Sequence, residues 1–390
     1  MRQVRQGNST DRAALEALWD YSFEARTTPF FRFYFDTCYR AEETLVAETE
    51  AGVAAALHLR PYTLTVRGAQ VDVTYIVGLT SHPAARGRGH AKALLAAALT
   101  EGCRQGRYAN ILMPSSMALY RPYGWALWCH LWRREAQLSD ISAPAPDGIR
   151  LVWLDESADM DALAAVYAAY TAARSGYARR TPSDWQRWLR GQLAEGHVIL
   201  ATDGRVPIGY WAYTLTDRTL TVGEQASIDP RGQAAMMHWL ARHTAEAERA
   251  VWYAPMDDAA YFGWADGAER TYITNRTLPW MAIRIADVAR WWEQLPAAAD
   301  GTLVVAVADP WQRETTHWAV RAAAGERPHV EATTRAADIH VGIGALGTLL
   351  MGGLDAAGLA RAGMLTGNPA AVERLRRMYP ACSVYNMEWY

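Results

Sequence analysis

A loop that alternates arginine and glycine, residues 86–91, separates two segments of different periodicity. It reads Arg-Gly-Arg-Gly-His-Ala. Before it, apolar residues alternate from Val71 to Val77, which indicates a strand; after it, they recur at helical spacing from Leu94 to Leu99. Glycine lets backbone amides approach a ligand, and a helix N-terminus favours an anion. The sequence therefore predicts a strand, an anion-binding loop suited to pyrophosphate, and a helix. An exposed turn that only starts a helix is the alternative.

The loop fits neither of two common phosphate-binding patterns. It has no Gly-Lys followed by serine or threonine, and no Gly-x-Gly-x-x-Gly at the start of a parallel sheet. Turn signals at 50–52 and 67–69 divide the segment before the loop into strands. The sheet in front of the loop is therefore predicted to be a mostly antiparallel meander.

The length of the chain, 390 residues, predicts two or three domains, because one domain usually has about 100–200 residues. Segment 138–150 is rich in Pro, Ala and Ser and lacks periodicity, which is typical of a connection. The order helix, strands, helix then recurs, whereas the last hundred residues follow another pattern. We expect domains at 1–140, 149–285 and 286–390, with the second a weak internal copy of the first.

Composition excludes several classes of partner. The formal net charge is −2, so the basic footprint of a nucleic-acid or anionic-membrane binder is missing. No apolar run approaches the ~20 residues of a membrane span. The four cysteines lie far apart without a Cys-x-x-Cys pair, and no His-Glu-x-x-His occurs, so neither a metal site nor a disulfide framework is predicted. We expect a cytoplasmic protein without nucleic-acid or membrane partners.

A second motif lies about thirty residues after the loop. Segment 113–125 reads Met-Pro-Ser-Ser-Met-Ala-Leu-Tyr-Arg-Pro-Tyr-Gly-Trp. Together with Arg-x-x-Gly-x-Ala at 86–91, it resembles the GCN5-related N-acetyltransferases (GNAT). The three-part layout resembles their enhanced-intracellular-survival (Eis) group over nearly the whole chain. The resemblance implies an α/β (α+β) architecture, with two tandem GNAT-fold domains, the second degenerate, followed by a sterol-carrier-protein-like α+β domain.

The resemblance also implies acetyl-CoA as acetyl donor, with no metal. In the family, a strand offers backbone groups to the pantetheine arm, the glycine loop holds the pyrophosphate, and a serine turn lies beside the thioester. The matching positions in this sequence are Leu79, Thr80 and Ser81 on the strand, Arg86, Gly87, Arg88, Gly89, His90, Ala91 and Lys92 in the loop, and Ser115 and Ser116 in the turn.

Two further positions match catalytic groups of the family. Tyr120 matches the general acid that protonates the departing CoA thiolate, and a phenol with a pKa near ~10 is protonated at neutral pH. The carboxylate of Tyr390 matches the general base of Eis-like proteins, where the last residue folds back into the active site. Glu388 is a nearby rival for the base. A packed aromatic tail with a solvated terminus is the alternative to both.

The acceptor implied by the resemblance is a primary amine, on an aminoglycoside, a polyamine or a lysine of a peptide or protein. Asp20 and Glu24 are candidates to attract it, although they also fit ordinary solvated helix charges. The aromatic cluster 30–35 is either core or the wall of an apolar pocket. Segment 228–234 of the second copy lacks the loop pattern, so we expect no cofactor there.

Two expectations concern the whole protein. The resemblance implies a homo-oligomer, a hexamer in the family. A function of another class is a non-catalytic carrier, in which the C-terminal domain binds an apolar ligand and the acetyltransferase lobe is a relic. The intact loop 86–91 and Tyr120 favour the enzyme, because a relic need not keep them.

Overall fold

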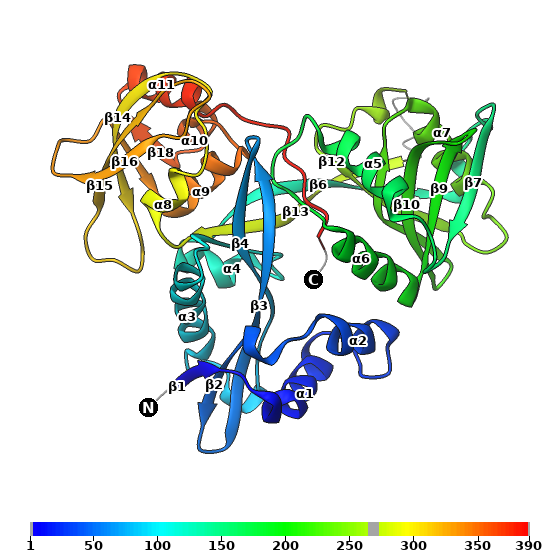
Figure 1. Cartoon of the computed structure of the whole chain (residues 1–390), viewed down its shortest axis with the longest axis horizontal. Coiled ribbons are helices and arrows are strands. Elements are labelled where there is room, and N and C mark those ends of the chain that lie inside the picture. Colours follow the sequence, from blue (N-terminus) through cyan, green and yellow to red (C-terminus); the bar gives the residue numbers. More distant parts are fainter. Residues whose placement is uncertain (1–2, 264–272, 389–390) are drawn as a thin grey trace.

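A computed structural model describes residues 3–263 and 273–388 of the chain. The molecule has three lobes that meet at a central point, where the described part of the C-terminal tail ends (Figure 1). One cluster of buried apolar residues includes members from all three lobes, so the lobes pack against one another and share a core.

The first lobe is a twisted sheet with helices on both faces. Its helix α3 packs against the central strands on one face, and α1 covers β3 and β4 on the other. The antiparallel meander predicted from the turn signals is confirmed, because β2, β3 and β4 pair in that order. The elements of this lobe are β1 (Gln3–Gln6), α1 (Arg12–Ser22), α2 (Pro29–Phe33), β2 (Thr44–Thr49), β3 (Gly52–Val66), β4 (Ala69–Ser81), α3 (His90–Arg104), β5 (Ala109–Leu112), α4 (Met117–Tyr120) and β6 (Ala126–Gln137).

The second lobe repeats this plan, as the recurring order of elements predicts. Helices α5 and α7 pack on its antiparallel strands. Its elements are β7 (Ile149–Leu154), α5 (Met160–Thr171), β8 (Tyr177–Ala178), α6 (Pro182–Glu195), β9 (His197–Asp203), β10 (Val206–Thr216), β11 (Thr219–Ser227), α7 (Pro230–Ala241), β12 (Arg249–Pro255) and β13 (Ile273–Ile285).

One 13-stranded sheet joins the first two lobes, which the sequence did not predict. Twelve strands follow the order β1-β2-β3-β4-β5-β13-β6-β12-β11-β10-β9-β7, and the thirteenth, β8, pairs with β3 outside this order. Strand β13 therefore lies between β5 and β6 of the first lobe, and β6 also pairs with β12 of the second. The two GNAT-like units exchange their last strands, and this ties them together by backbone hydrogen bonds.

The third lobe has a five-stranded sheet of order β16-β15-β14-β17-β18. Its helix α9 is buried and packs on β6 and β13. A Cβ at Gly347 of α9 would lie 2.9 Å from the Ile283 side chain, so glycine permits this close approach. The elements are α8 (Val288–Trp292), β14 (Gly301–Ala308), β15 (Thr316–Ala322), β16 (His329–Thr333), β17 (Ile339–Gly342), α9 (Ile343–Met351), α10 (Ala356–Arg361), β18 (Leu365–Gly367) and α11 (Pro369–Met378).

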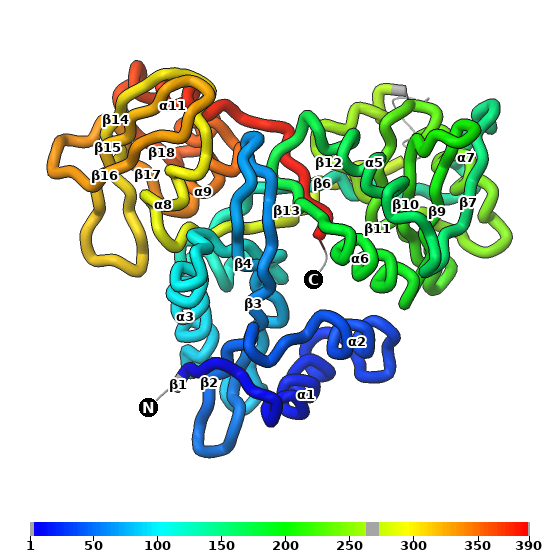
Figure 2. Tube along the Cα trace, in the orientation of Figure 1, coloured from blue at the N-terminus to red at the C-terminus, as the bar shows by residue number. Residues whose placement is uncertain are grey.

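After α11 the chain leaves the third lobe as an extended tail, the red end of the trace in Figure 2. The tail crosses the second lobe, where the Ser175 amide donates to the Ser383 carbonyl and the Tyr385 amide donates to the Ser175 carbonyl, each at 2.9 Å. Asn386 Nδ2 donates to the Gly176 carbonyl at 2.9 Å. The tail is therefore a structural element that all three lobes share.

Within these described ranges, no helix has the length and apolarity needed to cross a membrane.

Candidate active site

Strands β4 and β5 form a fork in the first lobe. They pair in parallel at only two positions, Thr74 with Asn110 and Tyr75 with Ile111. Beyond Tyr75, β4 continues to Ser81 with no β5 partner. The β4 edge that faces the opening therefore keeps backbone donors and acceptors available for a ligand.

A glycine bulge shapes the long arm of this fork. The β3–β4 register shifts between Ala56 and His58, opposite Gly78. Gly78 has φ +63°, and a Cβ there would lie 2.6 Å from the Trp19 ring of α1. Only glycine fits this position, because both the backbone conformation and the close ring exclude a side chain. The bulge redirects β4 just where the fork opens.

The predicted anion-binding loop lies at the end of the long arm. Gly87 and Gly89 adopt φ of +73° and +79°, and Gly89 caps α3 without any side chain over its first turn. Arg86, Arg88 and Lys92 are exposed, and none forms an ion pair with a carboxylate of the described chain. A helix start with bare amides and unpaired cations suits a pyrophosphate.

The other predicted cofactor residues lie around the same opening. Leu79 and Ser81 are half-buried on β4, and the Thr80 hydroxyl is 2.6 Å from that of Ser22 on α1. Ser115 and Ser116 are exposed after β5, and Ala91 is half-buried in the first turn of α3.

His90 differs from the rest of the loop. Its side chain is 3% exposed, and its two ring nitrogens have no hydrogen-bond partner among the described residues. Its ring points into protein, so a ligand in the opening can contact His90 through the backbone amide.

Tyr120 ends α4 beside the fork. It packs in one apolar cluster with Ile76 and Leu79 of β4 and Leu112 of β5, which are the two arms of the fork. The side chain is 7% exposed, and burial raises the pKa of its phenol, while a hydrogen bond with Ser115 opposes part of this rise. Tyr120 is therefore a protonated phenol at neutral pH.

The tail reaches the base of the fork. The Tyr75 hydroxyl donates to the Glu388 carbonyl at 3.2 Å, and Tyr75 is the last β4 residue that pairs with β5. The Glu388 side chain forms an ion pair with Arg180 of the second lobe at 2.8 Å. Tyr390, the predicted base, lies outside the described residues.

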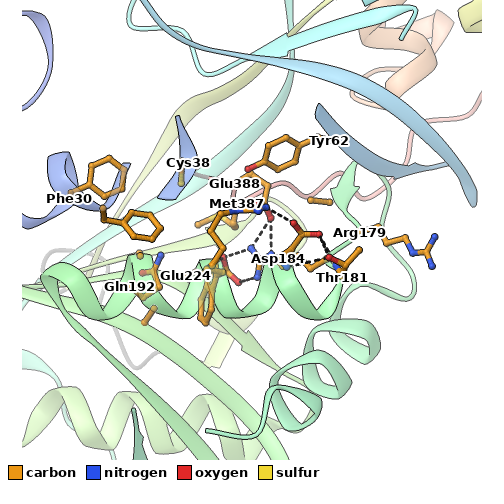
Figure 3. Close-up of a pocket in the computed structure, with 18 of the residues that line it drawn as sticks. Phe30, Cys38, Tyr62, Arg179, Thr181, Asp184, Gln192, Glu224, Met387 and Glu388 are labelled. Atoms are coloured by element: carbon orange, nitrogen blue, oxygen red, sulfur yellow. Dashed lines mark hydrogen bonds and ion pairs between the residues drawn. The ribbon is translucent and has the colours of Figure 1, made fainter. Parts of the chain in front are cut away.

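A cavity of about 690 Å³ opens beside this point, between the first and second lobes. It runs along α6, from Phe30 and Gln192 at one end to Thr181 and Arg179 at the other, with Met387 and Glu388 of the tail between them (Figure 3). Its aromatic walls include Phe30, Phe33, Tyr62, Trp188 and Tyr253. A ligand in this cavity would contact the tail directly.

The cavity settles the two interpretations of the aromatic cluster 30–35. Phe31, Tyr34 and Phe35 are core residues, whereas Phe30 and Phe33 line the cavity. Both interpretations therefore hold, each for different residues of the cluster.

Glu195 lines the cavity beside Phe30, and its charge acts on Glu24, which is not itself a lining residue. Burial raises the pKa of Glu24, and the charge of Glu195 raises it further, while a hydrogen bond from Trp19 Nε1 lowers it. Glu195 accepts from the Phe30 amide at 3.4 Å. Neither forms an ion pair with a described cation, so the Glu195 carboxylate is available to a cationic ligand in the cavity. Asp20, in the last turn of α1, instead accepts from the backbone amide of Arg26.

The second lobe has an equivalent fork, but its own side chains close it. Strands β11 and β12 pair in parallel as far as Val222 and Trp252, like β4 and β5. Just beyond, Gln225 Nε2 donates across the gap to the Tyr253 carbonyl at 2.7 Å. The Tyr253 carbonyl, which an open fork would offer to a ligand, is therefore already bonded to Gln225. A pantetheine arm has no equivalent binding groove between these two strands.

The helix that follows the second fork is also closed to anions. Asp229 caps α7 and accepts from the Arg231 amide at 2.7 Å, and Arg231 pairs with both Asp229 and Asp203. A carboxylate already occupies the helix start where α3 has only Gly89, and it would repel a phosphate. These contacts give a physical reason for the expectation that the second copy binds no cofactor.

Metal-ligating side chains do not gather in this part of the chain. Among residues 3–263 and 273–388, no three or more His, Cys, Asp or Glu side chains form a group that could hold an ion.

Comparison with known families matches this architecture lobe by lobe. A model of the acetyltransferase (GNAT) domain matches residues 3–128, and a second model of the same description matches 176–285. A model of the sterol carrier protein domain matches 288–386. The chain is a tandem GNAT acetyltransferase. It is therefore an enzyme of the acyltransferase type, and its GNAT domains imply the use of acetyl-CoA and an amine acceptor.

Solved structures share the fold of this tandem GNAT enzyme over the whole chain. A GCN5-related N-acetyltransferase from Anabaena variabilis superposes with a TM-score of 0.85 at 18% identity, covering 100% of both chains. Eis1 from Mycobacterium abscessus superposes with a TM-score of 0.76 at 18% identity, again over 100% of both chains. The Eis-type domain architecture predicted from the sequence is confirmed.

A relative in sequence comes from Streptomyces griseus. This uncharacterized N-acetyltransferase is 26% identical over 313 residues, which cover 74% of each chain. It is similar to the tandem GNAT enzyme in class, and its printed description names no acceptor.

Three site residues escaped the sequence analysis: Tyr75, Arg180 and Glu195. None lies in a motif, since Tyr75 belongs to an ordinary alternating strand, Arg180 lies just before α6, and Glu195 is the last residue of α6. Arg180 lies 208 positions from Glu388 in the sequence. Only the folded chain brings these residues together.

Proposed function

We propose that the enzyme transfers acetyl from acetyl-CoA directly to a primary amine, with no acyl-enzyme intermediate. The observation that carries this proposal is that the first lobe has an open fork with bare helix amides, while the tail lies at its base. Holding an amine beside a thioester supplies much of the rate of such a reaction.

The donor site that we propose uses the open arm of β4 and the loop after it. Backbone groups of Leu79, Thr80 and Ser81 would bind the pantetheine arm, and residues 86–92 would bind the pyrophosphate. Bound acetyl-CoA supplies an activated acetyl thioester and a thiol leaving group. The exposed Ser115 and Ser116 would lie near the thioester.

Tyr120 is the general acid in this proposal. Its buried phenol keeps its proton at neutral pH, since burial raises its pKa. It can then donate that proton to the departing thiolate, which contributes typically ~10²-fold or more to the rate.

The general base in this proposal is the carboxylate of Tyr390. The Glu388 carboxylate is already paired with Arg180, so it is a poorer candidate to accept a proton from the amine. The Tyr75 hydroxyl holds the Glu388 carbonyl two residues before Tyr390, at the base of the fork. An α-carboxylate has a pKa of ~3.5, and removal from water would raise it toward a useful value.

The acceptor in this proposal enters the cavity along α6. Glu195, supported by the charge of nearby Glu24, would attract an ammonium group, and the aromatic walls would cover the apolar part of the molecule. Aminoglycosides, polyamines and lysine side chains all carry such amines. By resemblance, we further propose a cytoplasmic homohexamer.

The test is CoA thiol release from acetyl-CoA with a panel of aminoglycosides, polyamines and lysine peptides. We expect release with at least one amine class and a fall in kcat of about 10²-fold in Tyr120→Phe. The acetyl-CoA dissociation constant should change little, because the phenol acts in the transition state. An equal loss of binding and turnover would refute the role of Tyr120.

The carrier alternative makes a different prediction. A relic lobe would neither bind acetyl-CoA nor release thiol, and purified protein would retain an apolar ligand detectable by mass spectrometry. Acetyl-CoA binding without release across the panel would point to an untested acceptor.

A further inference from the structure

One buried arginine of the second lobe holds the tail of the third. Arg180 Nε donates to Glu388 Oε1 at 2.9 Å, and its two terminal nitrogens donate to the two Glu224 oxygens, each at 2.8 Å. The three side chains are 3%, 10% and 4% exposed. Figure 3 shows Glu224 and Glu388 converging over α6.

The surroundings fix this arginine in place. Its guanidinium lies over the rings of Tyr167 and Trp185, each 4.6 Å from the centroid, and of Trp188 at 5.2 Å. Glu224 also accepts from the Tyr210 hydroxyl at 2.6 Å and from Trp188 Nε1 at 3.1 Å. Arg180 and Glu224 thus form a binding site for a carboxylate within the second lobe, and Glu388 of the C-terminal tail binds to it.

The first and second lobes therefore both bind Glu388, each through a different group of that residue. Tyr75 of the first lobe binds the Glu388 carbonyl, and Arg180 of the second binds its carboxylate. An apolar side chain at position 388 could fill this space without the cost of removing charges from water. It would not, however, fix the position of the tail as the ion pair with Arg180 does. A glutamate at position 388 is therefore expected if the enzyme needs the tail in one defined position.

We propose that Arg180 is a positioning residue for acetyl transfer: it holds Glu388, the last described residue of the tail, at the base of the β4–β5 fork. This inference rests on the proposed function. In this proposal the second GNAT domain, whose own fork is closed, positions a residue for the reaction in the first domain.

The experiment uses the full chain with Arg180→Ala. This change removes the guanidinium and leaves a space between three rings that a free guanidinium ion can enter. We expect kcat to fall about 10²-fold, the size of a general-base contribution, with the KM for acetyl-CoA within about threefold of wild type. Guanidinium chloride at non-denaturing millimolar concentration should restore part of kcat.

A matched control and a second variant accompany it. Arg190→Ala removes an exposed arginine of α6 that pairs with Glu156 at 3.5 Å, and it should change neither kcat nor the guanidinium response. Glu388→Ala leaves the Arg180–Glu224 pair intact, so the second lobe keeps its binding site for a carboxylate. It should lower kcat as much as Arg180→Ala does, without rescue by guanidinium.

Amide hydrogen exchange of residues 383–388 gives a readout independent of activity. Exchange should accelerate in Arg180→Ala and slow again with guanidinium. Unchanged kcat in both variants, or lost kcat with wild-type exchange in the tail, would overturn the inference. Absence of transfer by the wild-type enzyme would instead refute the proposed function, and tail exchange would still decide whether Arg180 holds the tail.

Discussion

At the residue scale, His58 shows how burial sets a response to acid. It is 4% exposed on β3, its Nδ1 lies 2.5 Å from the Tyr34 hydroxyl, and its ring stacks on Trp19 and Tyr34. Burial, with a smaller contribution from the charge of Arg60, lowers the pKa of His58 to about 3. In the unfolded chain the same imidazole has a pKa of about 6.5.

This difference predicts that His58 makes the protein sensitive to acid. Between pH 6.5 and 3 the unfolded chain binds a proton that the folded chain does not, so the free energy of unfolding falls as pH falls. From pH 7 to 5 the loss should be about 2 kcal/mol. His58→Gln should remove this part of the pH dependence, measured as urea midpoints at both pH values.

His340→Gln is the control for that measurement, because His340 is exposed on β17. It should keep the pH dependence of the wild type. If His58→Gln lost as much stability in acid as the wild type, another group would be responsible.

At the scale of elements, helices α3 and α7 begin in opposite ways. Gly89 leaves the first turn of α3 bare, whereas Asp229 places a carboxylate on that of α7. Gly89→Asp should therefore make α3 resemble α7. We expect at least about tenfold weaker acetyl-CoA binding, since two negative charges would compete for one helix start.

Gly89→Asn separates charge from shape. Asparagine and aspartate both tolerate the left-handed backbone of this position, φ +79°, but asparagine carries no charge. It should bind acetyl-CoA more tightly than the aspartate variant by calorimetry, and added salt should narrow the gap. Equal affinities of both variants and the wild type would mean that the loop holds no phosphate.

At the scale of the whole molecule, the tail joins the lobes. Deletion of residues 383–390 would remove the buried side chains of Tyr385, Asn386, Met387 and Glu388. Burial of one large apolar side chain contributes about 1.5–3 kcal/mol, so we expect a loss of several kcal/mol, seen as a lower melting temperature. Acetyl-CoA binding should survive, because the fork and loop belong to the first lobe.

A shorter deletion separates packing from chemistry. Removal of 389–390 alone keeps the contacts of Glu388 with Tyr75 and Arg180 but moves the terminal carboxylate. It should abolish most amine transfer with little change in melting temperature. Transfer at the wild-type rate would reject the terminal carboxylate as the base.

Local patterns predicted much of this architecture. The alternation from Val71 to Val77, the loop at 86–91 and the helical spacing after it lie close together in sequence, so local physics fixes them. They were enough to predict β4, the loop and α3. The order of elements likewise predicted the second GNAT-like unit and the different third lobe.

Contacts between distant segments could not be predicted in this way. The insertion of β13 between β5 and β6, the side chain of Gln225 across the second fork, and the buried ring of His90 each depend on how the lobes pack. The pairing of Arg180 with Glu388 spans 208 positions. The sequence by itself determined which segments form strands, loop and helices, because those preferences are local. The tertiary structure alone decided the cavity, the closed second fork and the contacts that hold the tail. These features depend on burial and charge pairing between residues that are far apart in the sequence.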